Sequence, residues 1–163
     1  MKKQIILRGF HRPLQLIPAC FKNMKSGLTF SLTKEIVFTG SCRYKLHSND
    51  WNKLFGVRAG IFGIRTNSGC FAWRYSNGMI EIAIYTYING EQDVSPVKTI
   101  PINKRFKFDI RRHFNYLSYY INDQLVGESW IGADNNILWG CGLYFGGNRR
   151  ASQTIIVKQE NLD

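Results

Sequence analysis

The sequence predicts an all-β protein, an antiparallel β-sandwich of the jelly-roll type that follows an extended basic N-terminal arm. Three observations support this fold class. Short runs of alternating apolar and polar residues recur along the 163 residues, with turn-forming residues about every 8–12 positions. No segment longer than about ten residues has the apolar period of an amphipathic helix. Asn-Gly and Asn-Asp pairs stand between neighbouring runs, as they do in two-residue hairpin turns.

Residues 1–25 are predicted to form the arm, and residues 26–163 the sandwich domain. Pro13 and Pro18 exclude a helix between them, whereas Gln4–Leu7 has the composition of one short strand. Residues 1–34 contain seven basic and no acidic side chains. Basic residues interleaved with apolar ones suit a segment that docks on a partner or across its own domain. The arm residues that we expect to dock are Lys2, Lys3, Arg8, Arg12, Lys22 and Lys25.

The sandwich strands are predicted from alternation and from β-branched or aromatic content. Their ranges, in chain order, are 28–32, 35–39, 42–46, 51–54, 55–64, 69–76, 79–87, 97–102, 105–111, 116–121, 124–129, 138–145 and 154–158. The run 55–64 contains Gly56, Gly60 and Gly63, which is typical of bends and bulges in a curved sheet.

Asn77-Gly78 fixes the register of the strongest predicted hairpin. If this turn has two residues, Ser76 faces Met79, and Arg74 faces Glu81. One face of the hairpin is then continuous and apolar, and we predict that it is buried: Tyr75, Trp73, Phe71, Ile80, Ile82 and Ile84. The other face carries the Arg74–Glu81 pair, an ordinary cross-strand contact worth about 0.2–1 kcal/mol.

Composition excludes several classes of protein. No apolar run approaches the roughly 18 residues that span a bilayer, so no membrane insertion is expected. The spacing of Cys20, Cys42, Cys70 and Cys141 matches no zinc pattern. We therefore expect no metal and no cofactor. Free thiols are favoured over two disulfides, since cysteines in strands are often small buried apolar residues.

The N-terminus does not resemble a signal peptide. Lys2 and Lys3 would serve as the basic region, but the apolar Ile5–Leu7 run is followed at once by Arg8. We expect synthesis in the cytoplasm without a signal peptide.

Several motifs resemble known sandwich proteins. The string Y-Y-I-N-D-Q-L-V-G at residues 119–127 resembles a hairpin of laminin-G-like and concanavalin-A-like domains. Together, W-N-K-L at 51–54, W-R-Y at 73–75 and Y-F-G-G-N at 144–148 resemble small uncharacterised proteins of gut Bacteroidetes and their tailed phages. Those proteins are distantly similar to alginate-lyase-type jelly rolls. The resemblance covers residues 28–158 and implies the fold more than a function.

The motifs of a lyase of this type are incomplete, so we predict no enzyme and no catalytic residues. The resemblance implies a cationic side chain for the uronate carboxylate and a His/Tyr pair for proton transfer. Near Tyr144 the sequence has neither the Lys nor the second Tyr of the lyase motif, and it has no Q-x-H. The acidic residues are scattered, whereas glycoside hydrolysis needs a carboxylate pair.

Glycan binding is the alternative use of the fold, because sugars need aromatic platforms and polar or charged side chains. The ligand-binding candidates are Trp51, Arg74, Glu81, Tyr85 and Tyr87. Packing alone would also explain Trp51, and Trp73 is expected in the core. Despite a net charge of +11, we do not expect nucleic acid as the partner, because no motif of that class is present.

The sequence thus favours a non-catalytic binding or structural protein, a phage virion component (capsid decoration, head-fibre or tail-associated) docked through its basic arm to other virion or surface-assembly proteins. The alternative is a carbohydrate-binding module or lectin with a glycan partner. The third hypothesis is an inactive relative of a polysaccharide lyase.

Overall fold

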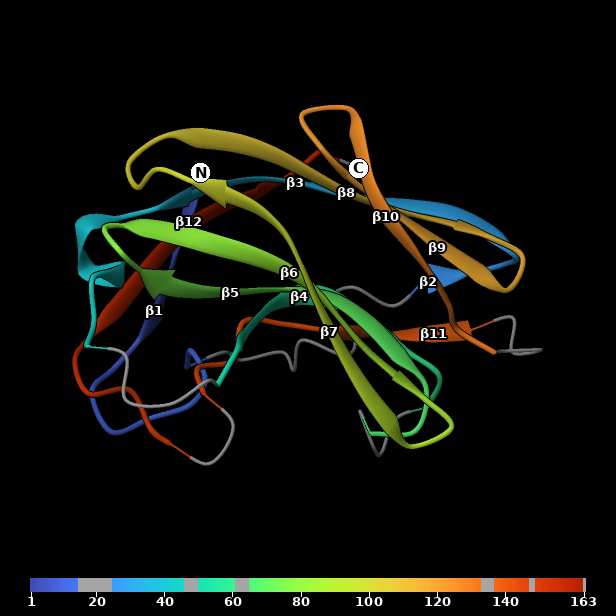
Figure 1. Cartoon of the computed structure of the whole chain (residues 1–163), viewed down its shortest axis with the longest axis horizontal. Helices are drawn as coiled ribbons and strands as arrows, with labels where there is room; N and C mark the ends of the chain where they lie inside the picture. Colours follow the sequence, from blue (N-terminus) through green and yellow to red (C-terminus); the bar gives the residue numbers. More distant parts are fainter. Residues whose placement is uncertain (15–24, 46–49, 61–64, 133–136, 147–148, 163) are drawn as a thin grey trace.

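The computed structural model is a sandwich of two antiparallel sheets (Figure 1) and describes residues 1–14, 25–45, 50–60, 65–132, 137–146 and 149–162. The elements are β1 Lys2–Ile6, β2 Lys25–Ser26, β3 Thr29–Phe38, the 3-10 turn η1 Gly40–Cys42, β4 Asn52–Arg58, β5 Ser68–Ser76, β6 Met79–Ile88, β7 Glu91–Ile100, β8 Arg105–His113, β9 Tyr116–Ile121, β10 Gln124–Trp130, β11 Ile137–Cys141 and β12 Ile155–Asn161. Among the described residues, no helix is long and apolar enough to cross a membrane.

Within the described residues, each sheet has six strands. Sheet 1 has the order β1-β12-β3-β8-β9-β10, and sheet 2 has the order β2-β11-β4-β5-β6-β7. The apolar faces of the two sheets pack together, and their largest fully buried side chains include Trp73, Tyr119, Phe38, Phe55 and Phe71. The predicted all-β jelly-roll sandwich is confirmed, and each sheet keeps an outer face on which a binding site can be built.

The β5–β6 hairpin has the predicted register. Ser76 pairs with Met79, Arg74 with Glu81 and Trp73 with Ile82. Asn77 and Gly78 have φ values of 49° and 84°, the left-handed conformation that both central residues of a tight hairpin turn need. The predicted apolar face lies in the core, where Trp73 is fully buried.

The short strand expected at Gln4–Leu7 is present as β1, Lys2–Ile6. This strand does not lie outside the sandwich: it pairs along its whole length with β12. Ile6 is fully buried, so burial of its apolar side chain holds this strand in the sheet. Lys25 belongs to β2 and pairs with Leu138. Lys22 lies outside the described residues, and the docking role of the arm remains a prediction.

Several strand predictions differ from the structure. The predicted strands 51–54 and 55–64 form the single strand β4, which ends at Arg58, and the predicted strand 138–145 is shorter, because β11 ends at Cys141. Strand β3 runs unbroken over residues 29–38, with Lys34 on its inward side and 5% exposed. Strand β7 starts at Glu91, six residues earlier than expected, because it is an edge strand on which Pro96 is tolerated beside a bulge. The expected strand 42–46 is replaced over its described part by the end of η1 and an irregular segment, and Leu46 lies outside the described residues.

Cys42, Cys70 and Cys141 are buried free thiols, and Cys20 lies outside the described residues. Burial raises the pKa of Cys42 to about 12, and burial also raises the pKa of Cys70. The thiols of Cys42 and Cys70 are therefore protonated at neutral pH and pack as small apolar side chains.

Candidate functional site

The outer face of sheet 2 gathers the predicted ligand-binding residues around a buried centre of small side chains. This centre is formed by Cys70, Ala72 and Ala83, all fully buried. They lie on the face of the β5–β6 hairpin opposite the predicted core face, the face that also carries Arg74 and Glu81. Larger side chains from β4, β6 and the segments near Trp51 and Tyr144 surround this centre and carry its polar and aromatic groups.

Trp51, Arg74 and Glu81 form one continuous group on this face. Nε of Arg74 donates to Oε2 of Glu81 at 2.6 Å, and the guanidinium carbon lies 4.4 Å from the centre of the Trp51 ring. The carboxylate and the indole together hold the guanidinium in place. An arginine fixed in this way presents its remaining N–H groups in a preset orientation, which suits recognition of hydroxyl or carboxylate groups.

A second group centres on Lys53. Its Nζ lies 4.4 Å from the centre of the Tyr85 ring and 5.6 Å from that of Tyr144. Backbone pairing between Lys53 and Tyr144, with N···O distances of 2.8 and 2.9 Å in the two directions, holds β4 against the segment that follows β11. This cation lies between two aromatic rings on the outer face of the sheet.

Tyr85 and Tyr87 extend this group toward the edge strand β7. Both hydroxyls donate to Oε1 of Gln92 at 3.0 Å, and the two rings meet edge to face with centres 5.7 Å apart. Burial, followed by the hydrogen bond with Tyr87, raises the pKa of Tyr85. The hydroxyl of Tyr85 therefore stays protonated at neutral pH and serves as a hydrogen-bond donor.

His11 and Arg12 join the same face from the N-terminal segment. The His11 ring stacks on Tyr144 with centres 5.0 Å apart and planes within 13°, and the Arg12 guanidinium lies 5.3 Å from the same ring centre. Nδ1 of His11 lies 2.8 Å from the carbonyl oxygen of Phe145. Because that oxygen only accepts, Nδ1 is the protonated nitrogen when His11 is neutral, and Nε2 carries the lone pair.

The sequence identified part of this face. Trp51, Arg74, Glu81, Tyr85 and Tyr87 all lie on it, as described above. The sequence analysis missed Lys53. The alternation of residues along its strand predicts only that Lys53 points outward, and no local pattern predicts its pairing with Tyr144.

The arm candidates separate in the structure. Arg12 contacts Tyr144 on this face, whereas Lys2 and Lys3 belong to β1 in sheet 1. Arg8 follows β1 and is exposed. In the described part of the chain, no three His, Cys, Asp or Glu side chains gather as they would around a metal ion.

Comparison with known proteins supports the fold class. No protein-family model and no curated protein matches the chain. Solved structures do: alginate lyase AlyC3 in complex with dimannuronate is similar over 99% of this chain and 74% of its own, with a TM-score of 0.62 and 12% identity. Alginate lyase PA1167 from Pseudomonas aeruginosa is similar over 83% of this chain and 68% of its own, with a TM-score of 0.54 and 11% identity.

A functionally unknown protein from Saccharomyces cerevisiae is similar over 83% of this chain and 70% of its own, with a TM-score of 0.55 and 11% identity. At these identities the likeness shows the fold, a jelly-roll sandwich of the alginate-lyase type. The resemblance to that fold is confirmed. The resemblance to gut Bacteroidetes and phage proteins is not shown, and nothing in these neighbours supports a virion role.

Proposed function

We propose that this chain binds an acidic glycan on the outer face of sheet 2 and does not catalyse a reaction of that glycan. The observation that carries the proposal is the alternation of cations and aromatic rings there: Arg74 on Trp51, and Lys53 between Tyr85 and Tyr144. Aromatic rings suit the C–H faces of sugars, and the adjacent cations suit their carboxylates. Alginate lyase AlyC3, which has the same fold, was solved in complex with dimannuronate, and this supports an acidic glycan as the class of ligand.

Charge favours an acidic ligand over a neutral one. Lys53, Arg74 and Arg12 bring three cations to this face, and Glu81 is already bonded to Arg74. The face therefore has a net positive charge. Binding through exposed charges of this kind weakens as salt screens them, with a screening length of about 8 Å at physiological ionic strength.

The test is calorimetric titration with hexamannuronate. Trp51→Ala removes the ring against which Arg74 lies, and we expect it to weaken binding about ten-fold, the effect of losing an aromatic contact worth about 1.4 kcal/mol. Trp130→Ala is the matched control, because Trp130 is an exposed tryptophan on sheet 1, and it should leave the affinity unchanged. The proposal fails if the wild-type chain does not bind, or if both variants weaken binding equally.

Lyase activity is the second candidate function, favoured by one observation. His11 and Tyr144 stack with Lys53 and Arg12 beside them, which brings together the residue types that proton abstraction next to a uronate carboxylate requires. Nε2 of His11 is the candidate base in such a reaction. Incubation with alginate and measurement of ultraviolet absorbance decides the matter: we expect no rise from unsaturated product. A rise that His11→Ala abolishes would establish the lyase instead.

A further inference from the structure

An open cleft of about 770 Å³ lies on the outer face of sheet 1, on the opposite layer of the sandwich from the face described above. Four neighbouring strands line it, and its polar and aromatic side chains include Ser31, Arg111, His113, Tyr116, Ser118 and Glu128. Its volume falls within the roughly 300–1,000 Å³ that small-ligand sites occupy.

Strand register arranges these side chains in rows. Ser31 pairs with Arg111, Arg111 with Ser118 and Ser118 with Glu128, so one polar row crosses β3, β8, β9 and β10. The next row in one direction contains Tyr116, which pairs with both His113 and Trp130. A row of hydrogen-bonding groups thus lies beside a row of rings, with about 7 Å between successive outward rows along a strand.

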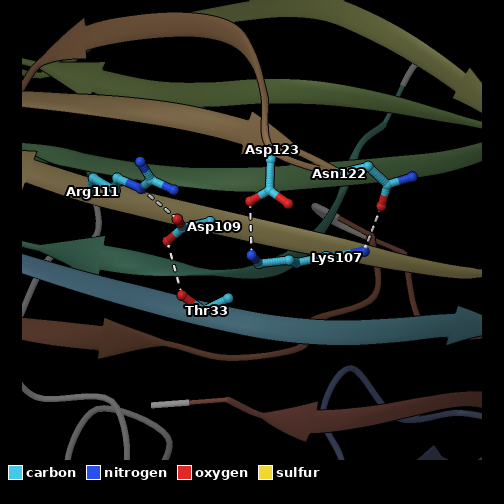
Figure 2. A network of polar contacts seen from close by, with 6 residues as sticks. All are labelled: Thr33, Lys107, Asp109, Arg111, Asn122 and Asp123. Carbon is cyan, nitrogen blue, oxygen red and sulfur yellow. Dashed lines mark hydrogen bonds and ion pairs between the residues drawn. The ribbon is translucent and has the colours of Figure 1, made fainter.

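The polar row is held in place by the outward row on its other side, which contains Thr33, Asp109 and Tyr120. Asp109 is 3% exposed, and its carboxylate accepts from the hydroxyl of Thr33 at 3.0 Å and from Nε of Arg111 at 2.6 Å, as Figure 2 shows. The Arg111 guanidinium also lies 4.1 Å from the centre of the Tyr120 ring. Arg111 is therefore fixed from two sides before any ligand arrives, which reduces the entropy that binding costs.

The other end of the row is held in a similar way. The hydroxyl of Ser118 donates to Oε1 of Glu128 at 2.7 Å, which leaves the second carboxylate oxygen of Glu128 and the lone pairs of Ser118 as acceptors. The cleft therefore presents a fixed guanidinium donor near one end and fixed acceptors near the other.

The aromatic row offers exposed rings. Tyr116 is 55% and Trp130 is 36% exposed. Trp130 lies against the backbone of Gly132, where a Cβ atom would come within 2.3 Å of its ring, so a side chain at this position would displace the indole. Tyr116 lines the cleft, and its exposed ring is a platform of the kind that stacks on a sugar.

We propose that this cleft is a second glycan site, which binds an uncharged oligosaccharide and is separate from the acidic-glycan face of sheet 2. The charges at the cleft balance, because two guanidinium groups (Arg111 and Arg112) are matched by two carboxylates (Asp109 and Glu128). Arg112 also donates hydrogen bonds to the carbonyl oxygens of Phe114 and Gly27. A balanced set of donors and acceptors beside exposed rings matches hydroxyl groups and C–H faces, whereas an acidic ligand would meet the carboxylate of Glu128.

The experiment is calorimetric titration of the whole chain with four ligands. Three are uncharged hexasaccharides (cellohexaose, xylohexaose and mannohexaose), and the fourth is hexamannuronate. We expect at least one uncharged hexasaccharide to bind with a millimolar or tighter Kd. Tyr116→Ala and Arg111→Gln should each weaken that binding about ten-fold, as expected for an aromatic contact or a hydrogen bond to a charged group. Leu125→Ala is the control, because Leu125 is also 55% exposed and does not line the cleft.

Cross-testing separates this proposal from the function of sheet 2. Trp51→Ala should weaken hexamannuronate binding and leave the uncharged ligand unaffected, and Tyr116→Ala should do the reverse. Thermal unfolding verifies that each variant is folded. The proposal is overturned if no uncharged hexasaccharide binds at millimolar concentration, if Tyr116→Ala and Leu125→Ala have the same effect, or if Tyr116→Ala weakens hexamannuronate binding as much.

Discussion

Substitution of Lys53 by Met tests the candidate face of sheet 2 most directly. The change keeps an unbranched side chain but removes the cation that lies 4.4 Å from Tyr85 and 5.6 Å from Tyr144. Each cation–aromatic contact at a partly exposed site contributes about 0.5–1 kcal/mol, so the free energy of unfolding should fall by about 1–2 kcal/mol. For a chain of this length, that loss corresponds to a decrease in Tm of about 2–8 °C.

The effect of Lys53→Met on binding should be larger than its effect on stability. A hydrogen bond between an ammonium and a carboxylate contributes about 1.5–3 kcal/mol, so the Kd for hexamannuronate should rise about ten- to a hundred-fold. Lys98→Met is the control: it removes the same charge from β7, where the Lys98 amine lies 3.5 Å from Oε1 of Gln124. If both variants weaken binding equally, net charge attracts the glycan and the arrangement around Lys53 has no special role.

Three further predictions concern stability. Gly56→Ala places a Cβ atom 2.3 Å from the Cβ of Cys70. Such overpacking should lower the free energy of unfolding, measured by urea denaturation, by at least about 1–3 kcal/mol. An unchanged urea midpoint would contradict the close packing at this position. Burial raises the pKa of Cys42 from 9.0 and of Tyr44 from 10.0, each to about 12. The unfolded chain therefore loses these protons first, and the free energy of unfolding should fall as pH rises from about 9 to 12; urea titrations at a series of pH values would show it, and a flat profile would refute it. Deletion of residues 1–7 removes β1 with its buried Ile6, so it should cost at least the 2–5 kcal/mol of a large core truncation in a thermal melt, whereas an unchanged Tm would mean that β1 is dispensable.

The β5–β6 hairpin shows what local sequence can specify. Asn77-Gly78 selects a two-residue turn, and that turn alone fixes all nine pairs of the ladder. The alternation of Trp73 and Arg74 then assigns one to the core and the other to the outer face. Both steps use only neighbouring residues, which is why they could be predicted.

The outer face of sheet 2 shows where local reasoning ends. Cys70, Ala72 and Ala83 alternate as the solvent side of a hairpin would, yet they are fully buried, because their exposure depends on what packs over them. The stacking of His11 on Tyr144 joins residues from opposite ends of the chain, and no spacing rule connects them. The Thr33–Asp109–Arg111 contacts likewise require β3 and β8 to be neighbours, which the topology decides.

The pairing of β1 with β12 also has a mechanical consequence. These strands are antiparallel, with Lys2 opposite Gln159, and the amino group of Met1 lies 3.5 Å from Oε2 of Glu160. A pulling force applied at residues 1 and 161 therefore acts on the same end of the strand pair and perpendicular to its length. The interstrand hydrogen bonds would be loaded one after another, so the pair would unzip at low force, whereas strands pulled along their length share the load and resist shear.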